Sequence, residues 1–439
     1  MTSTNRATKP TRTRILKFGG TSLATPELIR AAAQQIAAIR ATGQPVAVVV
    51  SAMGHATDAL VALAGNVAGH RPTPRELDVL LATGEQAAAA LMAMALRTLA
   101  IDAASVVGAR IGILADSRHG HASIRQVQAT EVIDALARGA VPVIAGFQAV
   151  DAHGDLVTLG RGGSDTTAVA IAAAIRDAEA PDEPGSCEIL TDVAAIHTAD
   201  PRAFPSSTPI ESISAKSMLQ LARAGAQVMH SPAVALAIAA NVEITVREAH
   251  PASPGHLGTR IVPGLHEEPS PIAVGVMPDL HRLRLDDHEH PMPIIESVAR
   301  DLARQGLAVT IDPTGPGLVL ASSDASNAAE AIRSMALRAT IVIERDWSLV
   351  SLVGLPRDES RRRGFPEPHG WWDGTPSTAW WLIRSPETVG FATGLVELVS
   401  TPPAKPDVPT QRNGDYETFD CGEGACREPD RAAGATMSP

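Results

Sequence analysis

The sequence predicts an α/β fold in which a mainly parallel β-sheet lies between helices. Continuous apolar runs rich in β-branched residues occur at Val46–Val50 and Val141–Phe147, and such runs are typical of strands buried on both faces. Segments with apolar residues at helical spacing lie between these runs. Strands that alternate with helices in this way indicate parallel pairing, because each crossover helix returns the chain to the same edge of the sheet.

The first strand–helix–strand unit shows this alternation most clearly. Ile15–Phe18 is a short, mostly apolar run, and Thr25-Pro26-Glu27 then forms a helix start, with a capping hydroxyl, a proline and an acid. An apolar stripe continues to Gly43, and the strand Val46–Val50 follows. The same reasoning predicts, in chain order, a helix at 86–100, a strand at 105–107, a helix at 124–138, a strand at 141–147, a helix at 168–177, a strand at 187–190, helices at 217–224 and 234–240, and a strand at 242–246.

The composition changes after residue 264 and divides the chain. Residues 14–264 form the predicted α/β domain, and residues 266–271 read as a linker. Residues 272–345 alternate as a small βαββαβ module. Residues 346–400 open as a second copy, whose middle, 357–376, is charged and rich in glycine and proline. We expect residues 1–13 to be flexible and residues 401–439 to be disordered.

Composition and charge exclude several classes of protein. The chain of 439 residues carries a formal net charge of −11, so nucleic acid is not an expected partner. Its three cysteines are too few for a disulfide framework, and no ligand cluster predicts a metal site. The N-terminus lacks an apolar signal region, and no apolar run approaches the roughly 20 residues that span a bilayer. We therefore expect a cytoplasmic protein with no membrane contact.

The segment Leu159–Ala168, LGRGGSDTTA, carries the strongest chemical signal. Glycines let backbone N–H groups approach an anion closely, and the N-terminus of the apolar helix that follows favours negative charge. Arg161 lies between the glycines, where a guanidinium can bind a carboxylate or phosphate through two parallel hydrogen bonds. The segment predicts a place where two anionic partners meet.

Further motifs flank this segment. In chain order the full set is KFGGTS at 17–22, SAMGHATD at 51–58, TGEQ at 83–86, VPVIAGFQ at 141–148, TLGRGGSDTT at 158–167, TDVAAIHTADPR at 191–202 and GAQVMHSPAV at 225–234. Together they resemble the aspartate kinase family, whose catalytic domain has the amino-acid-kinase fold. The resemblance implies a three-layer α/β sandwich at 14–264, and ACT-like α+β modules at 272–345 and 346–400, the second degenerate. A homodimer formed through these modules is also implied.

The resemblance implies an ATP-dependent kinase that phosphorylates the side-chain carboxylate of L-aspartate by direct in-line transfer. Lys17 would stabilise the transferring phosphoryl group, and Asp165 would orient the catalytic cations. The residues implied to bind aspartate are Ser51, Thr83, Glu85, Arg161 and Ser164. Those implied to bind the nucleotide are Gly19, Gly20, Thr21, Gly162, Gly163, Thr191, Asp192, Arg202 and Gln227. Mg²⁺ is implied by ATP, and it needs no protein ligand cluster because it usually keeps waters and substrate phosphates.

Two alternatives remain open beside this reading. Gln227 stands where many family members carry lysine, and an amide brings no positive charge to the nucleotide. The second module has lost the pattern of the first. These departures leave open a related amino-acid kinase that acts on a different carboxylate in a specialised pathway. They also leave open a catalytically weak homologue that binds an effector or a partner.

Overall fold

The computed structural model describes most of the chain before residue 265 and separate stretches of the remainder. The described residues are 12–69, 72–226, 228–251, 258–264, 273–286, 291–304, 309–312, 317–321, 340–354, 366, 368, 370–372 and 378–400. Residues 1–11 and 401–439, expected to be flexible and disordered, lie outside these ranges. The linker at 266–271 and Gln227 also lie outside them.

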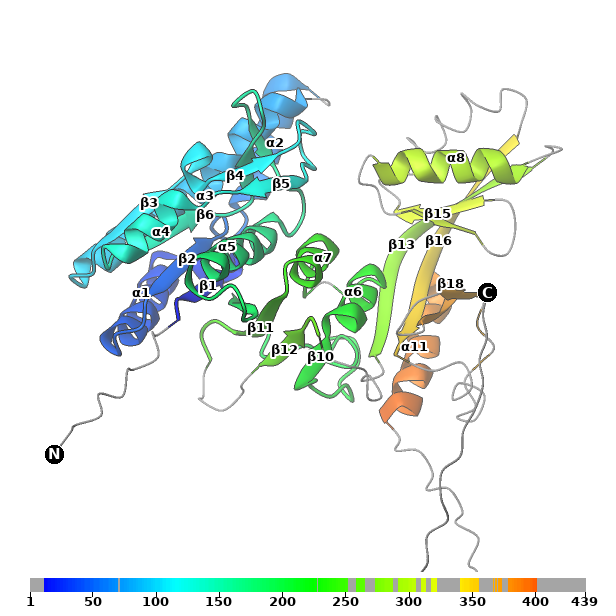
Figure 1. Cartoon of the computed structure of the whole chain (residues 1–439). Helices are drawn as coiled ribbons and strands as arrows, with labels where there is room; N and C mark the ends of the chain where they lie inside the picture. Colours follow the sequence, from blue (N-terminus) through cyan, green and yellow to red (C-terminus); the bar gives the residue numbers. More distant parts are fainter. Residues whose placement is uncertain are drawn as a thin grey trace, which may run out of the picture. The chain divides into compact units, whose positions relative to one another are not determined.

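An eight-stranded sheet organises the first part of the chain (Figure 1). Its strand order is β10-β12-β11-β9-β1-β2-β6-β3, and neighbouring strands pair in parallel except for β11 with β12. The predicted mainly parallel sheet is therefore confirmed. The strands are β1 (Arg14–Phe18), β2 (Val46–Val50), β3 (Ala103–Val106), β6 (Val141–Ala145), β9 (Gly185–Thr191), β10 (Ser212–Ser214), β11 (Val242–Glu248) and β12 (Thr259–Val262).

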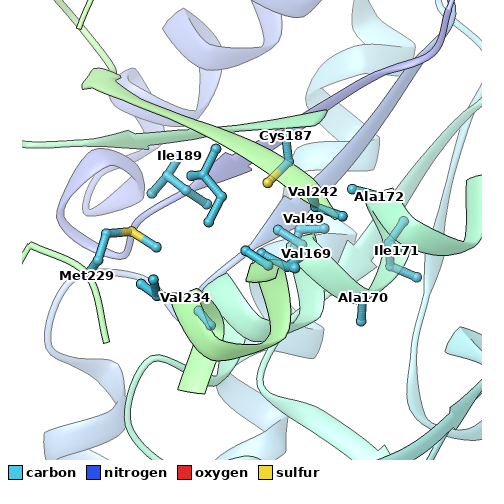
Figure 2. Close-up of a cluster of buried hydrophobic side chains, with 14 of the residues drawn as sticks. Val49, Val169, Ala170, Ile171, Ala172, Cys187, Ile189, Met229, Val234 and Val242 are labelled. Atoms are coloured by element: carbon cyan, nitrogen blue, oxygen red, sulfur yellow. The ribbon is translucent and has the colours of Figure 1, made fainter. Parts of the chain in front are cut away.

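Helices cover both faces of this sheet, because successive side chains of a strand point to opposite sides. In β2, Val48 packs into the core under α1 and α3, and Val49 packs into the core under α5 and α7. Figure 2 shows Val49 in the latter core with Val169 and Val234. The predicted three-layer sandwich is confirmed. Its helices are α1 (Pro26–Ala41), α2 (Ala56–Ala68), α3 (Pro74–Thr98), α4 (Thr130–Ala137), α5 (Gly163–Glu179), α6 (Ala215–Arg223) and α7 (Ser231–Ala239).

Several helix boundaries differ from the prediction. α3 begins at Pro74 rather than Gln86, because Thr73-Pro74-Arg75-Glu76 repeats the start signal seen before α1. Glu85 therefore lies inside a helix and not at its start. α5 begins at Gly163 rather than Ala168, which places Asp165 in the first helical turn. The predicted helix at 124–138 is wrong in its first part, which forms a strand.

A second, four-stranded sheet was not predicted, since its strands are too short to show a period. Its order is β5-β4-β7-β8, built from β4 (Ile113–Ala115), β5 (Ile124–Val127), β7 (Gln148–Val150) and β8 (Leu156–Thr158). Strand β8 ends two residues before Gly160. The last strand of the small sheet therefore leads directly into the glycine-rich segment.

A six-stranded antiparallel sheet forms the later part of the chain, in the order β14-β15-β13-β16-β18-β17. Helices α8 (Pro291–Arg304) and α11 (Ser385–Ser400) each bury an apolar face against it. The module boundary expected between residues 345 and 346 falls inside β16. The strands are β13 (Ala273–Asp286), β14 (Val309–Ile311), β15 (Gly317–Ala321), β16 (Thr340–Val353), β17 (Gly370–Trp372) and β18 (Thr378–Arg384).

Helix α3 is, among the described residues, the one helix long and apolar enough to cross a membrane by length and composition alone. Its Ala88, Met92 and Leu96 side chains are buried in the core that it shares with α1. The apolar character of α3 is therefore accounted for by its place in this core.

Gly84 allows α3 to approach the end of β2, and this contact yields a prediction. A Cβ at Gly84 would lie 2.8 Å from Ala52 Cβ, and Ala52 Cβ cannot move without its backbone. We expect Gly84→Ala to lower the free energy of unfolding by about 1–3 kcal/mol through overpacking. Gly65→Ala is the matched control, because Gly65 lies in α2 with nothing within 4 Å of an added Cβ. Chemical denaturation should show a gain of about 0.4–1 kcal/mol for the control. Equal effects of the two substitutions would contradict the close approach.

Candidate active site

Lys17 and Asp165 form a buried ion pair between β1 and α5. Lys17 is two residues from Ile15 on β1, so both side chains point to the face that α5 covers. Lys17 Nζ lies 2.5 Å from Asp165 Oδ1, and the two side chains are 9% and 7% exposed. A buried ion pair is weak evidence for stability. Lysine and aspartate are rarely buried, so a buried pair beside a glycine-rich turn is a candidate functional site.

The glycine-rich segment forms a tight turn immediately before α5. Gly160 has φ +74° and Gly162 has φ +70°, a region in which a side chain is disfavoured. Arg161 lies between them and is exposed, and it has no hydrogen bond or ion pair within the described ranges. The first N–H groups of α5 have no partner within their own helix, so this end favours an anion. The turn therefore presents a free guanidinium next to a helix N-terminus.

Close backbone contacts fix the start of α5 against the end of β6. A Cβ at Gly146 would lie 2.7 Å from Ser164 Cβ, and a Cβ at Gly163 would lie 2.8 Å from the Phe147 ring. Phe147 itself has φ +71°, and its N–H donates to Thr167 Oγ1 at 3.1 Å. These contacts leave α5 little freedom to slide, so Ser164 and its neighbour Asp165 have defined positions.

Glu85 lies in the middle of α3 with its carboxylate directed at the end of β2. Its Oε1 accepts a hydrogen bond from the Ala52 N–H at 3.0 Å, and its Oε2 is buried without a partner. Burial raises the pKa of Glu85 to about 7, although the Ala52 N–H and the Lys17 charge act in the opposite direction. A buried carboxylate with a free oxygen can bind a cationic group of a ligand.

The loop after β1 brings the nucleotide residues predicted at 19–21 next to Lys17. A Cβ at Gly19 would lie 3.9 Å from Lys17 Nζ and 3.8 Å from Thr191 Oγ1, so these groups converge on this glycine. A Cβ at Gly20 would lie 2.6 Å from Ala52 O. Thr21 begins a short 3₁₀ turn, Thr21–Leu23. The ends of β1, β2 and β9 therefore meet at one edge of the sheet, where open α/β sheets bind ligands.

A cavity of about 730 Å³ lies beside this edge. Thr191, Asp192 and Arg202 line it, and Arg202 Nη2 lies 3.4 Å from Asp192 Oδ2 in an exposed ion pair. The volume lies within the range that small-molecule and cofactor sites occupy. The structure thus places three predicted nucleotide residues around one cavity.

The structure does not bring every residue predicted to bind aspartate or the nucleotide into this site. Ser51 is half-buried at the end of β2, and its N–H donates to Phe18 O at 3.1 Å, beside the end of β1. Thr83 is exposed, and its hydroxyl donates to Leu80 O of its own helix at 2.6 Å. The roles of Ser51 and Thr83, like those of the other site residues, stay predictions, and Gln227 is not among the described residues.

His230 lies in this site, although the sequence motifs gave it no predicted role. It caps α7 with its backbone, and its ring packs on Gly162, where a Cβ would lie 2.6 Å from Cδ2. Burial lowers the pKa of His230, and Asp165 opposes this effect. No residue spacing could have revealed the contact, since 68 positions separate the two residues (230 − 162).

Comparison with known proteins defines the class of the chain. Residues 12–248 match the model of the amino acid kinase family. The chain is 41% identical over 295 residues to an aspartokinase of Thermus thermophilus, covering 67% of this chain and 70% of that one. It is 38% identical over 306 residues to the aspartokinase of Pseudomonas aeruginosa, covering 69% and 66%. This chain belongs to the amino acid kinase family, and within it to the aspartokinases.

A solved structure shares the fold of the chain. Escherichia coli aspartokinase III in complex with aspartate and ADP matches with a TM-score of 0.72 at 20% identity. The match covers 88% of this chain and 99% of that one. At this identity the likeness concerns the fold alone, and it extends beyond the α/β sandwich into the later part of the chain.

The raised pKa of Glu85 yields a prediction about stability and pH. The pKa is about 7 in the fold against an ordinary value of 4.5 for glutamate, so the contribution of Glu85 to stability is present at low pH and is lost as the pH rises toward 7. Glu85→Gln keeps the acceptor for the Ala52 N–H and cannot ionise. We expect its free energy of unfolding, relative to the unsubstituted protein, to rise by about 2–3 kcal/mol between pH 5 and pH 8.

Glu131→Gln is the control for this measurement. Glu131 is exposed, and Arg110 holds its pKa below the usual value, so its removal should bring no gain at pH 8. Urea denaturation at both pH values checks the comparison. A Glu85→Gln variant whose relative stability does not change with pH would show that Glu85 is ionised throughout.

Proposed function

We propose that this protein is an ATP-dependent kinase that phosphorylates the side-chain carboxylate of L-aspartate to an acyl phosphate. The observation that carries the proposal is the buried Lys17–Asp165 pair at the N-terminus of α5, one turn from the free Arg161 guanidinium. The positive charges of Lys17 and Arg161 suit a site where a carboxylate and a triphosphate meet. Identities of 41% and 38% to aspartokinases support aspartate as the acceptor.

Arg161 and Glu85 are the groups that would hold the acceptor. A guanidinium without a protein partner can bind the α-carboxylate through two hydrogen bonds, and Ser164 lies three residues further at the start of α5. The free Oε2 of Glu85 would accept from the α-ammonium group, which binds the ionised form of Glu85 best. Two charged anchors of opposite sign fix an amino acid at both ends of its backbone. Its side-chain carboxylate is then left for reaction.

Lys17 and the loop at Gly19, Gly20 and Thr21 would hold the phosphates, and Gly162 would add its N–H group from the α5 end. The Gly163 N–H donates to Gly160 O at 2.9 Å, so Gly163 would contribute through the close packing of the turn. Thr191, Asp192 and Arg202 would line the nucleoside side of the cavity. The buried Asp165 carboxylate would accept from waters bound to Mg²⁺, so the residues present fit this cation. Bound there with ATP, Mg²⁺ supplies neutralisation of phosphate charge.

The chemistry is a single displacement with no covalent enzyme intermediate. A side-chain oxygen of aspartate attacks the γ-phosphorus, and the bond from that phosphorus to the β–γ bridging oxygen breaks, so that ADP leaves. Phosphoryl transfer depends on positioning and on charge stabilisation. The Lys17 ammonium stabilises charge on the transferring group, and Asp165 keeps the ammonium in place. The fixed α5 holds Asp165 and the acceptor turn in register with β1.

The later part of the chain would carry regulation and assembly. We infer that its antiparallel sheet, α8 and α11 form ACT-like modules through which two copies associate in the cytoplasm. The continuous strand β16 (Thr340–Val353) joins both expected modules into one sheet. This inference also fits the extent of the match to the Escherichia coli fold, which covers 88% of the chain.

Hydroxylamine trapping tests the proposed reaction. The protein is incubated with ATP, Mg²⁺, hydroxylamine and single carboxylate amino acids, and the acyl phosphate is recorded as a coloured hydroxamate. We expect product with aspartate. A clear preference for another acid would replace the proposal by a related amino-acid kinase. Binding of aspartate without turnover of any acid would instead identify a catalytically weak homologue.

The ion pair gives a prediction that separates function from stability. Asp165→Leu leaves the Lys17 charge buried and unpaired, so we expect a loss of about 3–5 kcal/mol of stability. Adding Lys17→Met removes that charge, so the double variant should recover most of the loss. Both variants should have kcat reduced at least about 100-fold, because charge stabilisation is gone. Denaturation and hydroxamate assays check both parts. An active double variant, or one no more stable than Asp165→Leu, would contradict the assigned role.

A further inference from the structure

Asp78 is a fully buried carboxylate that the proposed chemistry does not use. It lies near the start of α3 and is 1% exposed. Three donors satisfy it: the Gly120 N–H at 3.0 Å, the Thr158 hydroxyl at 2.5 Å and the His119 ring at Nδ1, 2.9 Å away. A carboxylate is costly to bury, and charge-assisted hydrogen bonds of this kind offset the cost. Asp78 therefore binds together segments that are distant in sequence.

The three donors come from two segments that flank the acceptor turn. His119 and Gly120 belong to the loop between β4 and β5, and Thr158 is the last residue of β8. The two segments are also joined directly, since the Ala122 N–H donates to Thr158 O at 2.9 Å. Asp78 thus fixes the β4–β5 loop and the end of β8 to helix α3.

This fixed loop is in contact with the backbone next to Arg161. A Cβ at Gly160 would lie 3.1 Å from His121 Nδ1 and 3.2 Å from Gly120 O, so the loop closes one side of the turn. On the other side, Gly162 packs against His230 and leads into α5. Only Leu159 and Gly160 lie between Thr158 and Arg161, and this span is too short to absorb much displacement. A displacement of the segments that Asp78 holds would therefore also displace Arg161.

Helix α3 also carries Glu85, seven residues after Asp78. Seven residues are about two helical turns, so the two carboxylates lie on the same side of the helix, about 10.5 Å apart along its axis. Glu85 is directed at Ala52 and Asp78 at the β4–β5 loop. One helix is therefore in contact with both sides of the acceptor site.

We propose that Asp78 is a positioning residue for acceptor binding, because it holds the β4–β5 loop and β8 so that Arg161 is aligned with Glu85. The inference rests on the proposed function in that it takes Arg161 as the acceptor clamp. We assign the effect to the acceptor because the segments that supply the three donors contact the backbone of the turn that carries Arg161.

Asp78→Asn tests this role with little change in volume. The amide Nδ2 is a donor and would face at least one of the three native donors, leaving that group unpaired. We expect the KM for aspartate to rise about tenfold, which corresponds to about 1.4 kcal/mol, while the KM for ATP stays within about twofold. Isothermal calorimetry should show a matching loss of aspartate affinity.

Glu188→Gln is the control. Glu188 is a partly buried carboxylate of β9, and it accepts from Arg14 Nε at 2.6 Å and from Arg247 Nε at 2.8 Å. It makes no contact with β8, α3 or the β4–β5 loop in the described hydrogen bonds. We expect this control to lower the melting temperature without changing the KM for aspartate.

Smaller variants keep the inference testable if Asp78→Asn does not fold. Thr158→Val and His119→Gln each remove one partner and should raise the KM for aspartate by about two- to fivefold. Unchanged aspartate KM and affinity in folded variants would overturn the inference, as would equal changes for aspartate and ATP. Wild-type protein that binds aspartate without turnover would refute the proposed function. The calorimetric comparison would still decide the role of Asp78.

Discussion

The buried pair of Lys17 and Asp165 is the interaction on which the rest of the site depends. Lys17 belongs to β1, which lies between β9 and β2 in the interior of the eight-stranded sheet. Asp165 belongs to the first turn of α5, so the pair fixes the helix that presents the glycine-rich turn. Burying a lysine and an aspartate removes both charges from water, and this desolvation opposes stability. Their presence is explained when an incoming phosphate and its cation complete the charges.

Close contacts at glycines give this pair its surroundings. Because Gly84 has no side chain, Ala52 can pack against α3, and the Ala52 N–H then donates to Glu85 Oε1. Gly146 admits Ser164, and Gly162 admits the His230 ring. In each case a methyl group would push apart two elements that carry site residues. The motif glycines therefore matter for close packing as well as for backbone conformation. The packing of the core in this way determines where the site residues lie.

The sequence was sufficient for most of the main sheet and most of the helices that cover it, because these depend on local signals. Apolar runs such as Val46–Val50 mark buried strands, and glycines beside Lys17 and Arg161 mark ligand turns. The start of α3 was misplaced although Thr73-Pro74 signals it, since the Thr83–Gly84 pair resembled a helix boundary. The strands of the small sheet have three or four residues, too few for a period.

Contacts between residues that are distant in sequence could not be predicted from the sequence alone. Nothing in the spacing joins Asp78 to Gly120 and Thr158, or His230 to Gly162, because tertiary packing alone creates these neighbours. The roles of the site residues, Ser51, Thr83 and Gln227 among them, also stay predictions, because they rest on the resemblance. What the sequence supplied was the set of chemical groups. The structure added the information about which of these groups lie close together.

A crystal structure of the protein with aspartate, Mg²⁺ and a non-hydrolysable ATP analogue would test the central claim most directly. The account predicts the α-carboxylate of aspartate on Arg161 and its side-chain carboxylate about 3–3.5 Å from the γ-phosphorus, in line with the bridging atom. The γ-phosphate should contact Lys17, with Asp165 facing the cation. A γ-phosphate remote from the Lys17–Asp165 pair, or aspartate bound away from Arg161, would contradict the account.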